Sequence, residues 1–107
     1  MNIPDEDTKF IRNVLLPWSG IRVVYISESS STKKWPDIWL SYKNGIPMII
    51  VTQEWRRQNT PERRKRIVHE FLHLCGMEHD ESIGYNTIPA KDSFSKRVYR
   101  SLINGRM

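Results

Sequence analysis

The sequence has little cysteine and no long hydrophobic segment, and both absences limit what the protein can be. A single cysteine, Cys75, cannot form an internal disulfide, so we expect a reducing compartment and a small buried helix residue. The longest apolar run, Ile46 to Val51, has six residues, whereas a membrane-spanning helix needs about 20. The acidic start MNIPDEDTKF does not resemble a secretory signal. These features predict a soluble cytoplasmic protein.

The length and composition are those of one small globular domain. A chain of 107 residues can bury a single core, so we expect one domain over residues 1–107. Seventeen Lys and Arg against twelve Asp and Glu give a net charge of +5, with the excess concentrated between Arg56 and Arg66. Such a run can attract a polyanion, but we favour a solvated helix flank, because charge alone carries no information about function.

The first half of the chain predicts one helix and three strands. A helix is expected over about Asp5–Leu16, where acidic residues suit its start and Pro17 ends it. The segment Ile21–Ser27 is rich in β-branched residues and predicts a strand. The segments DIWLSYK and IPMIIVTQ flank Asn44-Gly45, the strongest short signal for a two-residue hairpin turn.

The two hairpin segments differ in pattern. IPMIIVTQ is apolar on both faces, as a central strand is, whereas DIWLSYK alternates and predicts an edge strand. An edge strand is either protected or accepts an extended peptide as a further strand. In DIWLSYK we expect Ile38, Leu40 and Tyr42 to face inward and Asp37, Trp39, Ser41 and Lys43 to face outward.

Two helices are expected in the second half, which completes an α+β fold around a small three-stranded sheet. Thr60 as N-cap, followed by Pro61, opens a helix that continues through Cys75 and ends at Gly76. A last helix is expected from about Asp92 to Asn104. It carries a narrow apolar stripe of Phe94, Val98 and Leu102.

All three histidines lie within eleven residues, in RIVHEFLHLCGMEHDE. His69 and His73 are four residues apart, so on a helix their imidazoles point to a common site. Gly76 can end that helix in a left-handed conformation and return His79 to the same site. Three neutral nitrogens with an open fourth position form the ligand set of a catalytic zinc site, so we expect one zinc ion.

Glu70 follows the first histidine and is the expected general base. Zinc lowers the pKa of a bound water to about 7, so Glu70 can accept its proton while the resulting hydroxide attacks a polarised carbonyl. H-E-x-x-H on a helix is a metalloprotease signature. The competing interpretation is a helix whose inner face merely carries imidazoles.

Other roles at the site stay open in the sequence, and for the oxyanion donor and the orienting residue an ordinary surface or core residue is the alternative. An acidic residue can replace His79 as third ligand; the candidates are Glu78, Asp80 and Glu81. Candidates for an oxyanion donor, by residue type, are Tyr85 and Tyr99. Candidates for orienting a ligand histidine are Asp80 and Asp92.

The histidine motif resembles those of two enzyme families. The pattern H-E-x-x-H-x-x-G-x-x-H of metzincin metalloproteases is matched by His69, Glu70, His73, Gly76 and His79. Metzincins also carry a downstream methionine turn, and this chain has no methionine between Met77 and Met107. The segment HLCGMEHD is similar to the histidine motif of the small bacterial rRNA-maturation endoribonucleases, which usually have glycine at the position of Glu70.

In length, order of elements and motif, the chain most resembles the minigluzincins, minimal soluble zinc metallopeptidases of the selecase and projannalysin type. The resemblance implies a zincin-like fold, zinc on His69, His73 and His79, and hydrolysis of peptides or unfolded proteins. It also implies self-inhibition by the C-terminal segment, here residues 91–107, which would dock in its own cleft or exchange between subunits. The alternative is a helix that only completes the core.

The expected function is therefore zinc-dependent endopeptidase activity with a peptide or unfolded protein as substrate and a possible homo-oligomer. Two other functions compete with it. One is a metal-dependent endoribonuclease, favoured by the histidine spacing and the Arg56–Arg66 run. The other is a non-catalytic zinc-binding interaction module. Neither a membrane nor a nucleic acid is the partner that we expect.

Overall fold

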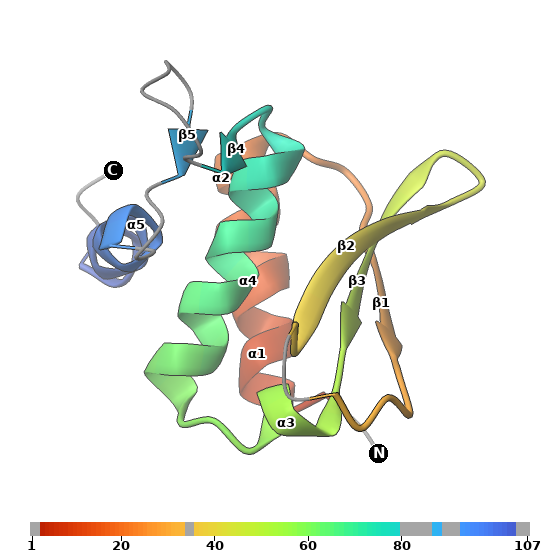
Figure 1. The fold of residues 1–107 in the computed structure, drawn as a ribbon. Helices are drawn as coiled ribbons and strands as arrows, with labels where there is room; N and C mark the ends of the chain where they lie inside the picture. The colour runs from red at the N-terminus through yellow and green to blue at the C-terminus, as the bar shows by residue number, and fades with distance from the viewer. Residues whose placement is uncertain (1–2, 34–35, 80–86, 89–92, 105–107) are drawn as a thin grey trace.

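The computed structural model describes residues 3–33, 36–79, 87–88 and 93–104 (Figure 1). Within these ranges a three-stranded mixed sheet and four helical segments confirm the α+β class. The strands of the main sheet are β1 (Tyr25–Glu28), β2 (Ile38–Lys43) and β3 (Ile46–Val51). The helical segments are the continuous run α1 (Asp5–Phe10), η1 (Ile11–Leu15) and α2 (Leu16–Ser19), then α3 (Gln53–Arg56), α4 (Thr60–Leu74) and α5 (Ser93–Ile103).

The main sheet has the order β1-β3-β2, so β3 is central and β2 is an edge, as the sequence predicts. β3 runs parallel to β1 and antiparallel to β2. Asn44 and Gly45 form the hairpin turn with φ values of 53° and 77°. β1 is shorter than the predicted Ile21–Ser27 strand: its pairing starts opposite Met48, next to Pro47, which has no amide hydrogen to donate.

The N-terminal helix continues through Pro17, so the expectation that Pro17 ends it is wrong. In η1 the helix widens, and the amide of Leu16 donates to the carbonyl of Ile11, five residues back. A proline lacks one helical hydrogen bond, and the π-helical turn before it accommodates the local disruption. The helix ends at Gly20, which has φ +74° and donates its amide to the Leu16 carbonyl at 3.0 Å.

Side-chain caps fix where α3 and α4 begin. The sequence did not predict α3; Thr52 caps it by accepting a hydrogen bond from the amide of Trp55 at 3.3 Å. The N-cap of α4 is Asn59 and not the expected Thr60, because the Asn59 side chain accepts from the amide of Glu62 at 3.0 Å. Both residue types are good N-caps, so the sequence alone does not distinguish the neighbouring positions.

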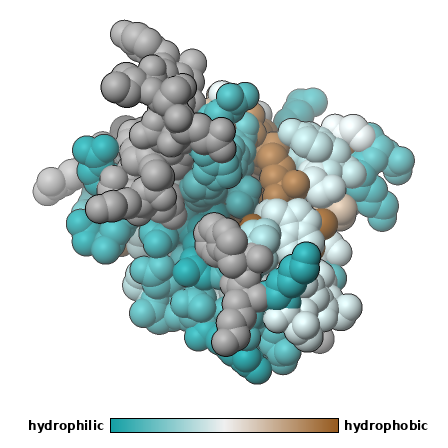
Figure 2. Space-filling model, viewed as in Figure 1, coloured by the Kyte–Doolittle hydropathy of each residue, from teal (hydrophilic) through white to brown (hydrophobic). Residues whose placement is uncertain are grey.

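One hydrophobic core lies between the sheet and the helices. α1 and α4 lie on one side of the sheet, and α5 packs against α4 away from the sheet (Figure 1). The most deeply buried apolar side chains are Leu15, Ile49, Val51, Trp55, Ile67, Val68 and Phe71. On the face shown in Figure 2, hydrophilic residues predominate and hydrophobic ones form a narrow strip. In the described part of the chain, no helix has the length and hydropathy to cross a membrane.

The C-terminal helix joins this core in the single chain. Val98 and Tyr99 are 6% and 7% exposed, and Leu102 packs against the core cluster. The ring of Tyr99 contacts Phe10 edge to face, with centroids 5.7 Å apart. These contacts agree with a helix that completes the core.

The side-chain orientations predicted for the segment DIWLSYK, which contains β2, are correct only in part. Ile38 and Leu40 face the core as expected. Tyr42 is 59% exposed, because the end of the hairpin extends past the helices (Figure 1). Asp37 is buried, at 2% exposure, and forms an ion pair with Arg66 of α4. The expected orientations of Tyr42 and Asp37 are therefore wrong.

A buried ion pair holds α4 against α1. Asp7 is fully buried, and its Oδ2 lies 2.8 Å from Nε of Arg63, which is 8% exposed. The same guanidinium contacts Glu6 at 2.7 Å. The basic run Arg56–Arg66 is therefore not simply the solvated flank that the sequence favoured, since part of it forms ion pairs inside the fold.

Cys75 also differs from its expected environment. It is exposed at the C-cap of α4 and is not buried within the helix. Partial desolvation still raises the pKa of its thiol, which disfavours the reactive thiolate.

Substitution of Asp7 by alanine should destabilise the fold by about 3 kcal/mol, because Arg63 would lose its buried partner and keep only the half-exposed Glu6. The matched control is Glu54→Ala, which removes a surface pair with Arg57 and should cost less than about 1 kcal/mol. Urea unfolding of both variants measures the difference. Equal losses in the two variants would contradict the importance of the buried pair.

Candidate metal centre

Two of the three histidines lie one turn apart near the C-terminal end of α4. Their side chains are partly buried, and their Nε2 atoms are 3.0 Å apart. His79 is exposed, and its Nε2 lies 3.0 Å from that of His69 and 3.3 Å from that of His73. The structure therefore brings the three predicted residues close enough to hold a metal ion.

A left-handed turn after α4 directs His79 to this position. Gly76 has φ +93°, and its amide donates to the His73 carbonyl at 3.0 Å, while the amide of Met77 donates to the Leu72 carbonyl at 3.0 Å. This pair of bonds is a Schellman motif, which satisfies carbonyls at the helix end as it reverses the chain. The next residues form β4 (Glu78–His79), which pairs in parallel with β5 (Thr87–Ile88).

The three nitrogens fit a metal ion better than they fit one another. A neutral imidazole nitrogen either carries a proton or accepts one, so among three adjacent nitrogens at least two have the same role and repel. In a tetrahedral zinc site, nitrogens about 2.0 to 2.1 Å from the ion lie about 3.3 Å apart. The observed separations of 3.0 to 3.3 Å are near this value. This geometry therefore argues against the competing interpretation, in which the three imidazoles are ordinary side chains that hydrogen-bond to one another.

The second ring nitrogens of the two helix histidines have partners of their own. Nδ1 of His73 donates to the carbonyl of Met77 at 2.7 Å, which leaves the lone pair of Nε2 directed to the cluster. Nδ1 of His69 lies 3.4 Å from Oγ of Ser95, on α5. Such partners fix the tautomer and the ring orientation of metal-binding histidines.

The environment of His73 favours its neutral form by lowering the pKa of the ring. Burial lowers the pKa of His73 from its usual value, the hydrogen bond to the Met77 carbonyl raises it, and the neighbouring His69 and His79 lower it further. The net direction is downward. A neutral imidazole is the form that coordinates a metal.

Glu70, the predicted base, lies on α4 between the two helix histidines and is 7% exposed. Tyr99, a candidate oxyanion donor, instead packs its ring in the core against Phe10. Glu78 is exposed and, among the residues that the structure describes, does not join the histidine cluster. The remaining candidates lie outside the described residues: Asp80, Glu81, Tyr85 and Asp92.

The sequence did not identify Ser95 as part of this region. Its position three and four residues before Val98 and Tyr99 places it on the buried face of α5, and it is fully buried. A serine on the buried face of a helix is the signal that identifies such a residue, because a buried hydroxyl requires a hydrogen-bond partner.

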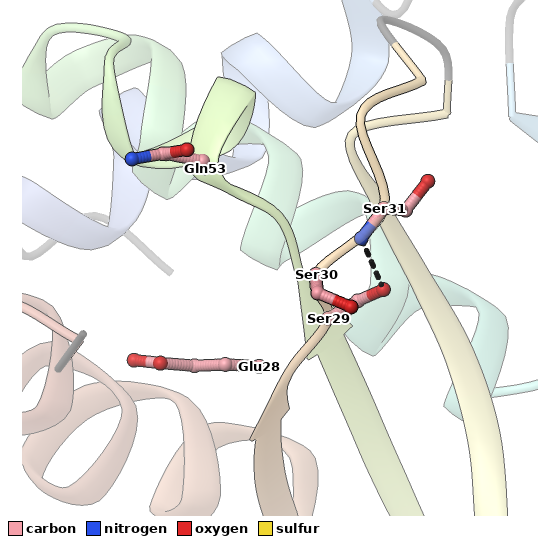
Figure 3. Close-up of a pocket in the computed structure, with 5 residues that line it drawn as sticks. All are labelled: Glu28, Ser29, Ser30, Ser31 and Gln53. Atoms are coloured by element: carbon pink, nitrogen blue, oxygen red, sulfur yellow. Dashed lines mark hydrogen bonds between the residues drawn. The ribbon is translucent and has the colours of Figure 1, made fainter.

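A cavity of about 350 Å³ lies elsewhere, between the end of β1 and the start of α3 (Figure 3). Four of its five lining residues are the consecutive Glu28 to Ser31, and Gln53 is the fifth. The amide of Ser31 donates to Oγ of Ser29 at 3.1 Å, which orders this loop locally. The metal-binding candidates do not line the cavity.

Comparison with known proteins identifies no relative. No protein-family model, no curated protein and no solved structure matches this chain. The function must therefore be inferred from the residues and their geometry.

Substitution of Gly76 by alanine should weaken metal binding and lower stability by about 1 to 2 kcal/mol. An added Cβ would meet no atom within 4 Å, so the cost comes from the positive φ of +93° and not from a clash. Calorimetric titration with zinc and thermal unfolding measure the two effects. Gly20→Ala is the control. Gly20 also has a positive φ and no atom within 4 Å of an added Cβ, but it lies at the end of α2. This substitution should lower stability and leave zinc affinity unchanged.

Proposed function

We propose that this chain is a zinc-dependent peptidase in which His69, His73 and His79 bind the ion. The observation that carries the proposal is the convergence of three Nε2 atoms within 3.3 Å at a helix bearing H-E-x-x-H. Zinc suits this donor set because it accepts neutral imidazole nitrogens in a tetrahedral site and leaves a fourth position for water or substrate. The resemblance to the minigluzincins supports the same activity.

The roles of the residues follow from their chemistry. Bound zinc would supply a Lewis acid that increases the acidity of water and polarises the carbonyl of the peptide. Glu70 accepts a proton from the attacking water and delivers it to the leaving amine nitrogen. Because Glu70 is 7% exposed, its carboxylate interacts with nearby charge more strongly than it would in bulk water.

The edge strand β2 is the proposed guide for the substrate. Among the described strands it pairs with β3 alone, so its other edge can align an extended peptide through main-chain hydrogen bonds. The ion pair between Asp37, just before β2, and Arg66 of α4 connects this strand to the helix that carries Glu70. The position of the edge relative to the base is thereby constrained.

The main competing function, RNA cleavage, receives less support from the charges. Arg63 and Arg66 form ion pairs with carboxylates of this chain, and Lys65 contacts Glu62 at 2.9 Å. A polyanion-binding surface requires cations that are available to phosphate groups. The Arg56–Arg66 run thus contributes to the fold, and fewer of its cations are available to a nucleic acid than the sequence suggests.

The Glu70→Gln variant tests the proposal. We expect wild type and variant each to bind one zinc, and cleavage of an unfolded protein to fall by about 10²- to 10⁴-fold, because only the base is removed. Zinc content by elemental analysis and proteolysis by mass spectrometry measure the two properties. The control is Glu78→Gln, an exposed acid beside His79, which should retain activity.

Three other results would reject the peptidase. Zinc binding without proteolysis by the wild type would indicate a non-catalytic binding module. Salt-sensitive, metal-dependent cleavage of RNA would indicate the endoribonuclease. Absence of metal binding would reduce the motif to a helix carrying imidazoles.

We further propose that the peptidase has a latent, self-associated form in which α5 exchanges between copies. In an exchanged dimer, Val98 and Tyr99 of one chain would occupy the core of the other, and the second copy would restrict the approach of substrate to the histidine cluster. Sedimentation should then show a dimer fraction that rises with concentration, and dilution should raise specific activity. A monomer at all concentrations, with constant specific activity, would contradict this form.

A further inference from the structure

Ser95 brings the C-terminal helix into contact with the histidine cluster. It lies 26 positions after His69 in the chain, yet its Oγ is 3.4 Å from Nδ1 of that histidine. Its side chain is fully buried. Among the described residues, His69 is the hydrogen-bond partner that the structure gives to this hydroxyl.

The tautomer of the His69 ring decides which atom donates the hydrogen bond in this contact. When Nε2 of His69 binds an ion, its lone pair is used and the proton of the neutral ring resides on Nδ1. Nδ1 then donates and the serine oxygen accepts. The corresponding acceptor for His73 is the Met77 carbonyl, which comes from the turn after α4. The two helix histidines are therefore oriented by different parts of the chain.

We propose that Ser95 is a positioning residue for the metal centre, which holds His69 in the tautomer and ring orientation that bind the ion. This inference rests on the proposed metal site. It does not require Ser95 to contact the ion or the substrate. Residues that orient ligand histidines in this way contribute roughly 10- to 100-fold to metal affinity.

Packing alone does not account for a serine at this position. Val98, Tyr99 and Leu102 supply apolar contacts of α5 with the core, and an alanine would fill nearly the same volume as the serine. The hydroxyl adds a polar group to a buried place, which costs free energy unless it is hydrogen-bonded. Its contact with His69 is the compensation that the structure provides.

The contact also couples metal binding to the docking of α5. If docked α5 increases metal affinity through Ser95, linkage requires that the bound metal stabilise the docking of α5 by the same factor. The amides of α5 should then exchange with solvent more slowly when zinc is present. This effect does not depend on catalysis.

The test compares Ser95→Ala with Ser101→Ala, a control on the same helix, in the full chain. Zinc affinity is measured by competition with a chromophoric chelator, and ligand geometry by the visible spectrum of the cobalt-substituted protein. We expect Ser95→Ala to bind zinc roughly 10- to 100-fold more weakly and to show an altered cobalt spectrum. Ser101→Ala should match the wild type in both measurements.

Two further measurements distinguish a positioning role of Ser95 from a purely structural one. Thermal unfolding in the presence of a chelator should give similar midpoints for both variants, because Ser95→Ala removes the buried hydroxyl together with the hydrogen bond that compensates it. Zinc should slow amide exchange in α5 of the wild type more than in Ser95→Ala. A second variant, Ser95→Cys, keeps a similar volume but offers a weak acceptor, and it should also lose affinity.

The outcomes distinguish this inference from the proposed function. If the wild type binds zinc and both Ser95 variants bind it within twofold, with an unchanged cobalt spectrum, Ser95 is not a positioning residue although the metal site stands. If the chelated Ser95→Ala protein is destabilised while its zinc affinity is unchanged, the role of Ser95 is structural and the inference fails. If the wild type binds no metal, the proposed function fails and this inference fails with it.

Discussion

The mutual approach of three imidazole nitrogens is the constraint on which the described structure around α4 depends. At 3.0 to 3.3 Å these atoms cannot all satisfy one another, because a ring nitrogen is either a donor or an acceptor. Holding them together therefore requires rigid support. The helix fixes His69 and His73 relative to each other, the Gly76 turn brings back His79, and partners at Nδ1 orient the two helix rings.

The support extends outward from α4 in three directions. Arg63 connects the helix to Asp7 of α1, and Arg66 connects it to Asp37 at the start of β2. On the side away from the sheet, α5 packs through Val98 and Tyr99. Arg63 and Arg66 thus link α4 to α1 and to the β2 strand, and apolar contacts hold α5 against α4. A helix attached to three elements is a suitable platform for a site that tolerates little displacement.

The sequence predicted well those features that depend on neighbouring residues. The four-residue spacing of His69 and His73, the left-handed Gly76 and the Asn44-Gly45 turn are local, and each lies in the expected place. Features set by distant contacts were missed or misjudged. The alternating pattern predicts that Asp37 faces solvent, but Asp37 is buried and forms an ion pair with the partly buried Arg66, 29 positions further along the chain. The role of Ser95 depends on how α5 docks, which no local pattern encodes.

The Schellman turn after α4 has a consequence for the order of folding. His73 and His79 are separated by six positions, and the turn between them is closed by hydrogen bonds within the same short segment. Closing so short a loop carries a small entropic cost, whereas the parallel pairing of β1 with β3 joins segments more than twenty positions apart. The histidine cluster is thus, like the Asn44-Gly45 hairpin, a low-contact-order part of the described structure. A metal ion that this cluster bound during synthesis would hold the end of α4 and the following turn together before the sheet has formed.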